Sequence, residues 1–304
     1  MTDPNNSLAS NILKTVVYFD LFDYPLTAEQ LFFFLPQNSV SAEEVKRSAD
    51  SLVTVKRLQK EKEFFFLPSR MKEIVDRRDE EERRAQGMLR TARFVSTFIK
   101  RFPFVRAIFL TGSLSKNVVD RTGDIDFMIV TAQNRVWICR TMLTIFRKIV
   151  LLGSKKYFCT NYYVTENGFV HQRRNLYAAI EVVTTKAVWN ESAFDEFQSS
   201  NEWTKEFLPN SRIEPDNQLL LSPSRSFFQR VCESVLNLLP LDALDVRLME
   251  MHRRHWHREF NAVDAEKFNS MFIISPDVSA GWPDDKAKPL LVRFNQHLSS
   301  LGIG

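Results

Sequence analysis

Glycine and cysteine are scarce in this chain. Its 304 residues include only 8 glycines and 3 cysteines, whereas 44% are hydrophobic and 26% are charged. Little glycine argues against long flexible linkers, and this balance is typical of a folded protein rather than a disordered one. Cys139, Cys159 and Cys232 stand far apart and form no CxxC pair. We therefore expect reduced, buried thiols.

Long apolar runs and extremes of charge are absent too. No segment approaches the roughly 20 apolar residues that span a bilayer, and the N-terminal MTDPNNSLASNILK lacks the pattern of a signal peptide. We expect a cytoplasmic protein that does not engage a membrane. The formal net charge of +4 permits nucleotide or nucleic-acid binding without requiring it. No GxSxG, HExxH or Walker-type loop occurs, which disfavours hydrolase and ATPase functions.

The chain is long enough for two or three units. Changes in the pattern of apolar and charged residues divide the chain into four segments, residues 1–68, 69–100, 101–190 and 191–304. Together they predict an α+β protein, in which an N-terminal unit and a connecting helix precede a central sheet and a mainly helical C-terminal region.

The first segment has the order of three helices followed by a hairpin. Apolar residues recur at helical spacing over Leu8–Asp20, and Thr27 and Ser41 are in position to cap two further helices. The run RLQKEKEFFFL, residues 57–67, suits two short strands joined at a charged turn. In this order the segment resembles a winged helix-turn-helix domain over its full length.

Winged helices often read DNA with their third helix, but here that helix carries mixed charge. Lys46, Arg47 and Lys56 are accompanied by Glu43, Glu44 and Asp50. Such a surface binds phosphates poorly, so dimerisation or packing beside the neighbouring unit is favoured over DNA contact. Residues 69–100 follow as a connecting helix, in which opposite charges three or four residues apart indicate a solvated face.

From residue 101 the sequence alternates between short apolar strands and helices, which predicts an α/β or α+β core. We expect strands at 105–112, 127–131 and 157–165, and helices at 136–150 and 175–189. Pro209, Pro215 and Pro223 then mark an irregular crossing. Beyond it we expect helices near 225–238 and 241–259, a loop over 275–289 and a last short helix over 290–301.

The segment 109–130, FLTGSLSKNVVDRTGDIDFMIV, carries the candidate chemistry. A strand runs into Gly112 and Ser113, and two aspartates then alternate with apolar residues on a new strand. Successive strand residues point to opposite faces, so Asp124 and Asp126 project together with side-chain roots roughly 7 Å apart. Such a pair can hold a divalent metal, and Mg²⁺ held by carboxylates suits phosphoryl and nucleotidyl transfer.

Residues beside the aspartates suit phosphate binding. Gly112 lets the backbone approach phosphates closely, and Ser113 offers both an amide and a hydroxyl. Lys116 and Arg121 lie close by in the sequence. Each either contacts triphosphate oxygens or is a solvated loop side chain.

The order of GS, a short linker and DxD in an apolar strand resembles the signature of the polymerase-β nucleotidyltransferase superfamily. The similarity extends over about residues 90–190 and implies a mixed sheet backed by helices. By position it implies that Asp124 and Asp126 bind Mg²⁺ or Mn²⁺, and that Gly112 and Ser113 hold the phosphates of a nucleoside triphosphate. Acceptors in this superfamily include small molecules, RNA ends and protein side chains, and the resemblance does not choose among them.

Full transferases of the superfamily usually add a third carboxylate on a later strand, and strand alternation puts Asn161 at that place. An amide cannot act as a base, so Glu181 or Glu166 would have to substitute, unless both are simply exposed. The main hypothesis is an Mg²⁺-dependent nucleotidyltransferase that uses Asp124, Asp126 and Glu181. The alternative is a catalytically impaired regulatory protein that senses a nucleotide or binds DNA through the winged helix.

A second cluster lies in MEMHRRHWHREF, residues 249–260, where His252, His255 and His257 stand among arginines. The spacing and the repelling arginines argue against a metal site. Contact with an anion or nucleic acid suits this composition, but a basic helix face that pairs with acids is favoured over it.

Overall fold

Capping side chains set the limits of the first helices. The computed structural model describes residues 4–212, 216–281 and 287–303. The N-terminal unit consists of α1 (Pro4–Asp20), α2 (Ala28–Phe33), α3 (Ala42–Thr54), β1 (Gln59–Glu61) and β2 (Phe64–Phe66). Thr27 and Ser41 cap α2 and α3, each in a capping box with the residue three positions on. Since β1 and β2 pair antiparallel, the predicted order of three helices and a hairpin is confirmed.

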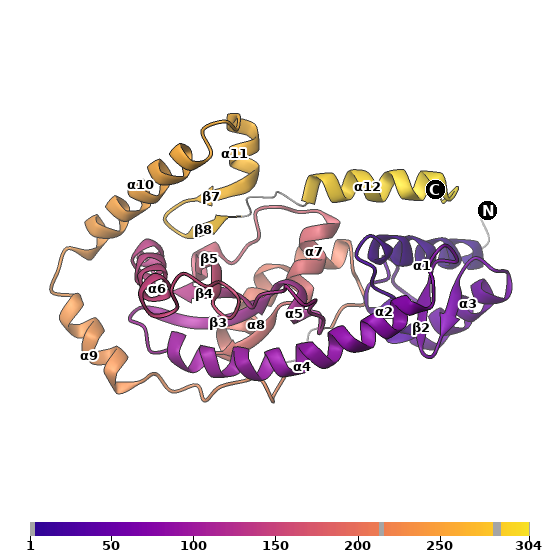
Figure 1. Ribbon diagram of the computed structural model, residues 1–304, viewed down its shortest axis with the longest axis horizontal. Coiled ribbons are helices and arrows are strands. Elements are labelled where there is room, and N and C mark those ends of the chain that lie inside the picture. Colours follow the sequence, from indigo (N-terminus) through magenta and orange to yellow (C-terminus); the bar gives the residue numbers. More distant parts are fainter. Residues whose placement is uncertain (1–3, 213–215, 282–286, 304) are drawn as a thin grey trace.

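One long helix, α4 (Glu73–Ile99), joins this unit to the sheet and runs along one side of the molecule (Figure 1). Apolar residues such as Val75 and Ala85 are buried along a stripe of α4. The predicted connecting helix is therefore confirmed. Arg78 is a buried charge on the same helix; its guanidinium lies 3.6 Å from the centre of the Tyr24 ring and pairs with Glu82.

The central sheet has six strands, β3 (Val105–Thr111), β4 (Asp126–Thr131), β5 (Cys159–Thr165), β6 (Lys186–Trp189), β7 (Phe272–Ile274) and β8 (Val278–Gly281). Their order is β6-β3-β4-β5-β8-β7. Among these strands β4 and β5 pair in parallel, and the other neighbours are antiparallel. The parallel pair needs a crossover, which α6 (Val136–Val150) provides. The predicted α+β class and mixed sheet are confirmed.

Helices cover both faces of this sheet. The remaining elements are α5 (Gly112–Ser115), η1 (Glu166–Gly168), α7 (Leu176–Val183), α8 (Glu191–Ser200), η2 (Glu202–Glu206), α9 (Phe227–Leu236), α10 (Leu241–Glu259), α11 (Ala265–Met271) and α12 (Ala287–Ser300). Within the described ranges, no helix combines the length and the apolar character that crossing a membrane requires.

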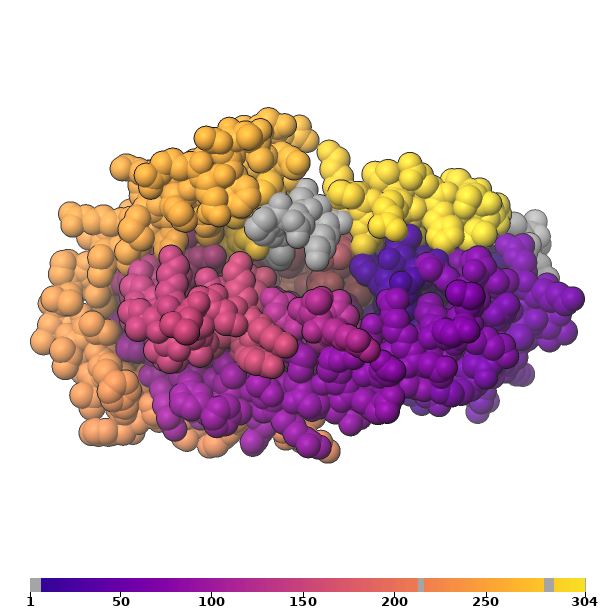
Figure 2. Space-filling view, viewed as in Figure 1, coloured from indigo at the N-terminus to yellow at the C-terminus, as the bar shows by residue number. Residues whose placement is uncertain are grey.

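Alternation along each strand divides the core in two. Met128 and Val130 belong to a cluster that continues through α7 and α8 into the N-terminal unit. Phe127 and Ile129, on the opposite face, belong to a cluster with residues of α4, α6 and α10. The N-terminal unit therefore shares a hydrophobic core with one face of the sheet. Figure 2 shows α12 lying across this unit as well, and Tyr18 of α1 meets Phe294 of α12 edge to face.

Two predictions about the second half of the chain are wrong. The single helix expected over 175–189 is split into α7 and β6, because Lys186–Trp189 pairs with β3 at the sheet edge. The loop expected over 275–289 contains β8, which pairs with β5 and β7, so the C-terminal region contributes two strands to the sheet. In both places, pairing with a distant segment overrides the local pattern.

Other expectations for this half have mixed outcomes. The helices expected near 225–238, 241–259 and 290–301 are confirmed as α9, α10 and α12, whereas α8 and α11 were not expected. All three cysteines are free, and Cys139 and Cys159 are buried. Cys232 is only partly buried, because its helix turns a polar side inward. Pro215 and residues 282–286 of the expected loop lie outside the described residues.

Candidate metal centre

A tight turn brings the glycine and the second aspartate together. Strand β3 ends at Thr111, which is paired with Asp126 at the start of β4, and α5 begins at Gly112. Gly112 has a φ of +72°, a left-handed conformation that favours glycine. A Cβ atom at this position would lie 2.5 Å from Asp126 Oδ2. The carboxylate of Asp126 therefore lies directly against the backbone of the turn.

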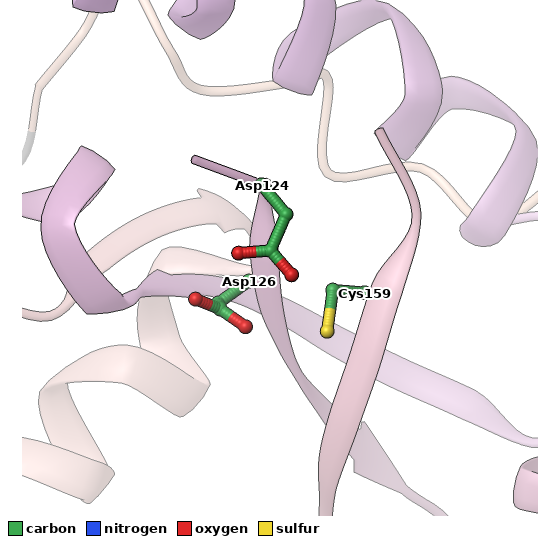
Figure 3. A group of neighbouring side chains, drawn as sticks. All are labelled: Asp124, Asp126 and Cys159. Atoms are coloured by element: carbon green, nitrogen blue, oxygen red, sulfur yellow. The ribbon is translucent and has the colours of Figure 1, made fainter. Parts of the chain in front are cut away.

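Asp124, Asp126 and Cys159 converge on one point (Figure 3). Each offers an oxygen or sulfur atom, and these atoms all lie within 4.8 Å of one another. Asp124 and Asp126 share a face because they stand two residues apart, as the sequence predicts. Cys159 joins them because it is opposite Asp126 in the parallel register of β4 and β5.

Burial and like charge perturb this group. Loss of solvent around Asp126, together with the nearby charge of Asp124, raises the pKa of Asp126 to about 6. Burial also raises the pKa of the Cys159 thiol, and the two carboxylates raise it further. A divalent cation between the carboxylates would offset their repulsion.

The donor atoms fit a hard cation. Carboxylate oxygens are the ligands that Mg²⁺ prefers in proteins, and Asp124 and Asp126 supply them on one side of the turn. The softer sulfur of Cys159 suits Mg²⁺ poorly and suits zinc-like metals better. The two aspartates are thus the residues that could hold Mg²⁺ or Mn²⁺.

Asn161 lies at the edge of this group. The register of β4 and β5 shifts between Phe127 and Met128, whose partners are Thr160 and Tyr162, so Asn161 is the extra residue of a bulge. Its amide nitrogen donates to Asp126 Oδ1 at 3.3 Å. The structure therefore brings Asn161 to the carboxylates, where alternation had placed it.

Lys116 and Glu181 form an ion pair beside the turn. Lys116 Nζ lies 2.8 Å from Glu181 Oε1 and donates to the carbonyl oxygen of Gly112 at 3.1 Å. The charge of Glu181 contributes to the raised pKa of Asp126, and Lys116 lowers it. Both residues thus belong to the electrostatic surroundings of the carboxylates, although one oxygen of Glu181 is engaged by Lys116.

Three other candidates form no hydrogen bond or ion pair with the two aspartates in the described part of the chain. Ser113 is exposed in the first turn of α5, and its hydroxyl bonds to no described residue. Arg121 is exposed in the loop before β4 and forms no hydrogen bond or ion pair within the described ranges. Glu166 follows Thr165 at the far end of β5, roughly 20 Å along the strand from Cys159. The structure therefore excludes Glu166 as a substitute for the third carboxylate.

The histidine-rich run of α10 is largely structural. His252 packs against the Trp137 ring and shares a hydrogen bond of 3.1 Å with Thr141, and Trp256 stacks on Phe272. Arg253 and Arg254 pair with Glu250, and His255 lies 3.4 Å from Glu259. The favoured interpretation was a basic face that pairs with acids elsewhere in the chain; the face does pair with acids, but these lie on α10 itself.

Searches against protein-family models, curated proteins and solved structures find no match. Evidence on function therefore comes from the site itself. Sequence reasoning placed Cys159 among buried thiols and missed its place beside the aspartates. No local signal would have found it, because only the parallel register of two strands sets it opposite Asp126.

Proposed function

We propose that this chain is a nucleotidyltransferase of the polymerase-β type. It would move a nucleoside monophosphate from a nucleoside triphosphate to a hydroxyl acceptor. Asp124 and Asp126 would hold Mg²⁺ or Mn²⁺, and the turn at Gly112 and Ser113 would receive the phosphates. The observation that carries this proposal is the contact of the Asp126 carboxylate with the glycine turn, with Asp124 on the same face.

Several properties of the site support this chemistry. A metal held here would neutralise charge on the triphosphate. Gly112 leaves no side chain between the turn and Asp126, and Ser113 is exposed, with its hydroxyl bonded to none of the residues that the structure describes. Lys116 holds a positive charge within hydrogen-bonding distance of the Gly112 carbonyl, close enough to contribute to the field at Asp126. Because Lys116 is paired with Glu181, the cation held by Asp124 and Asp126 would supply the positive charge that an anionic ligand needs.

A second candidate function is favoured by Asn161. The Asn161 side chain, which contacts Asp126 from β5, is an amide and cannot take a proton from an acceptor hydroxyl. Glu181, beside the turn, is the acid that could replace it, and Lys116 already engages Glu181. A protein with this site could bind a nucleotide and sense it without turnover.

The N-terminal unit fits a packing role in either case. We propose that it is a winged-helix-like domain that supports the site rather than one that reads DNA. Tyr24 donates a hydrogen bond to the carbonyl oxygen of Lys116 at 3.2 Å, so the unit contacts the residue next to the site. Lys46 and Arg47 of α3 are exposed beside Glu43 and Glu44. Gel-shift titration with duplex DNA should show no binding beyond a weak, salt-sensitive background.

Turnover distinguishes the two functions. Purified protein is incubated with each labelled triphosphate, Mg²⁺ or Mn²⁺, and a cell extract that supplies acceptors. Transfer of label that is lost in Asp124→Asn with Asp126→Asn, but kept in Asp195→Asn, supports the transferase; Asp195 is an exposed acid on α8. Nucleotide binding without transfer in any extract supports the sensor.

Asn161→Asp sharpens this comparison, because it restores a third carboxylate at the position that contacts Asp126. Label transfer by Asn161→Asp but not by the wild type would mean that the missing base alone separates the chain from activity. Absence of both binding and transfer in every variant would overturn both functions.

A further inference from the structure

Helix α9 has its polar side inside and its apolar side outside. Gln229 and Glu233 are buried. In contrast, Phe227, Phe228 and Val235 are 75%, 64% and 60% exposed. A surface helix of a lone globular protein normally does the reverse, because burying apolar area is what holds the helix to the core.

Hydrogen bonds fix α9 in this orientation. The Glu233 carboxylate accepts from the backbone amide of Phe104 at 2.6 Å and from Arg106 at 2.9 Å, and it also pairs with Arg225. The Gln229 amide donates to the carbonyl oxygens of Phe102 and Val105 at 3.0 and 2.8 Å. Rotating the apolar face inward would turn Glu233 and Gln229 out to solvent. The buried backbone groups and the guanidinium that they bind would then lose their hydrogen-bond partners, which is unfavourable. These hydrogen bonds therefore hold the apolar face of α9 outward.

This apolar face continues onto neighbouring elements. The side chains that are more than half exposed on it are Ile149, Val150, Phe227, Phe228, Val235 and Leu238. At about 150 Å² for each fully exposed side chain, these six present on the order of 600 Å² of apolar area. That value reaches the upper limit for the largest patch of a typical monomer, about 600 Å².

The same surface is hollowed between α6 and α9. An open groove of about 710 Å³ lies there, with Met142 and Ile145 on one wall and Phe228 and Val231 on the other. Phe227, next to the groove, projects into solvent. The patch thus contains both a cavity and a protruding side chain, which is the requirement for a surface that binds a copy of itself.

We propose that this surface, formed by α6, α9 and the link to α10, is the interface of a two-fold dimer of the chain. In such a contact, the projecting side chains of one α9 enter the groove of the other copy, and the reverse holds by symmetry. The roughly 600 Å² of exposed apolar area is about three quarters of the roughly 800 Å² that each partner contributes to a stable interface, and Ile145 and Val231, 50% and 43% exposed, add to it. Figure 2 shows α9 and α10 (orange) at the outer edge of the molecule, where a second copy has free access.

Charges around the groove predict how salt affects the dimer. Arg101 lines the groove, and Lys148 and Arg230 are exposed beside groove-lining residues of α6 and α9. Each copy brings the same positive charges to the contact, so they repel one another and added salt screens the repulsion. Dimerisation should therefore strengthen as salt rises. An anionic lipid surface or an acidic protein would give the opposite dependence.

Sedimentation equilibrium over a concentration series tests the proposal. The full chain should reach twice its 35.5 kDa mass as concentration rises, with tighter association at higher NaCl. Val235→Asp should weaken association at least tenfold. The matched control is Val55→Asp, since Val55 is 65% exposed in the N-terminal unit, and Figure 1 shows this unit at the opposite end of the molecule from α9.

Alkylation of Cys232 provides a second readout, because this partly buried cysteine lines the groove. Its reaction with iodoacetamide should be slower in the wild type at high concentration than in Val235→Asp. A wild type that stays monomeric at every concentration and salt would overturn the proposal. So would equal weakening by Val55→Asp, or a monomer that binds anionic vesicles and is released from them by salt.

Discussion

Replacing Asp126 by asparagine should stabilise the metal-free protein at neutral pH. Asp126 has a pKa of about 6 in the folded chain against an ordinary value of 3.8, because it is largely removed from solvent and faces the charge of Asp124. The folded state therefore holds this proton more tightly than the unfolded state. The contribution of the protonated Asp126 carboxyl to the free energy of unfolding is complete below pH 4 and is lost as pH rises through 6. Asparagine keeps the shape of the neutral acid and never ionises.

The size of the effect follows from the shift. A difference of one pKa unit corresponds to about 1.4 kcal/mol, so a change from 3.8 to about 6 gives at most about 3 kcal/mol at pH 7.5. Asp126 keeps some contact with solvent, which makes this an upper limit. At roughly 2 °C for each kcal/mol in a chain of this size, Tm should rise by up to about 6 °C.

Thermal melts in EDTA, recorded from pH 3.5 to 8 for the wild type and Asp126→Asn, measure this difference. The two melting curves should agree near pH 4 and separate between pH 4 and 6. Asp195→Asn, an exposed acid on α8, serves as the control and should change Tm by little at any pH. A variant that is no more stable than the wild type at pH 7.5, or that differs from it equally at pH 4, would refute the electrostatic account of the site.

Three more outcomes follow from the same contacts. Mg²⁺ or Mn²⁺ at 100 times its Kd should stabilise the wild type by about 2.7 kcal/mol but leave Asp124→Asn with Asp126→Asn unchanged, as followed by Tm; equal stabilisation of both would place the metal elsewhere. Gly112→Ala should cost about 1–3 kcal/mol in urea unfolding, because φ is +72° and the added Cβ meets Asp126, and an unchanged midpoint would contradict this. Glu233→Gln should cost about 2 kcal/mol at pH 7 through its lost pairing with Arg106. Although burial raises the pKa of Glu233, its hydrogen bonds lower that pKa overall. The wild type should therefore lose its extra stability over Glu233→Gln as pH falls below about 4.5. A stability difference between the two proteins that persists at pH 3 would argue against this account of the ion pair.

Local patterns were sufficient wherever neighbouring residues decide the conformation. Thr27 and Ser41 cap helices because their side chains reach amides three residues ahead. Local patterns failed over Lys186–Trp189, where pairing with β3 makes a strand of residues whose sequence predicts a helix. Local patterns failed again at Val278–Gly281, because nothing in the sequence around this segment indicates that β5 has an unpaired edge nearby.

The candidate site likewise has parts that local sequence patterns predict and parts that they do not. Gly112 and the pair Asp124 and Asp126 were predictable, because strand alternation alone puts two carboxylates on one face. The Lys116 ion pair was not, since Glu181 lies 65 residues away on α7. Nor was the approach of Cys159, which depends on the register between two strands.

The sequence by itself determined several of the helices, the class of the fold and the two aspartates beside a glycine turn. These depend on capping, periodicity and alternation, which act over a few residues. Only the tertiary structure decided which strands pair, that Cys159 meets Asp126, and that α9 turns its apolar face outward. Each of these depends on contacts between segments far apart in the chain, where burial and hydrogen bonding outweigh local preference.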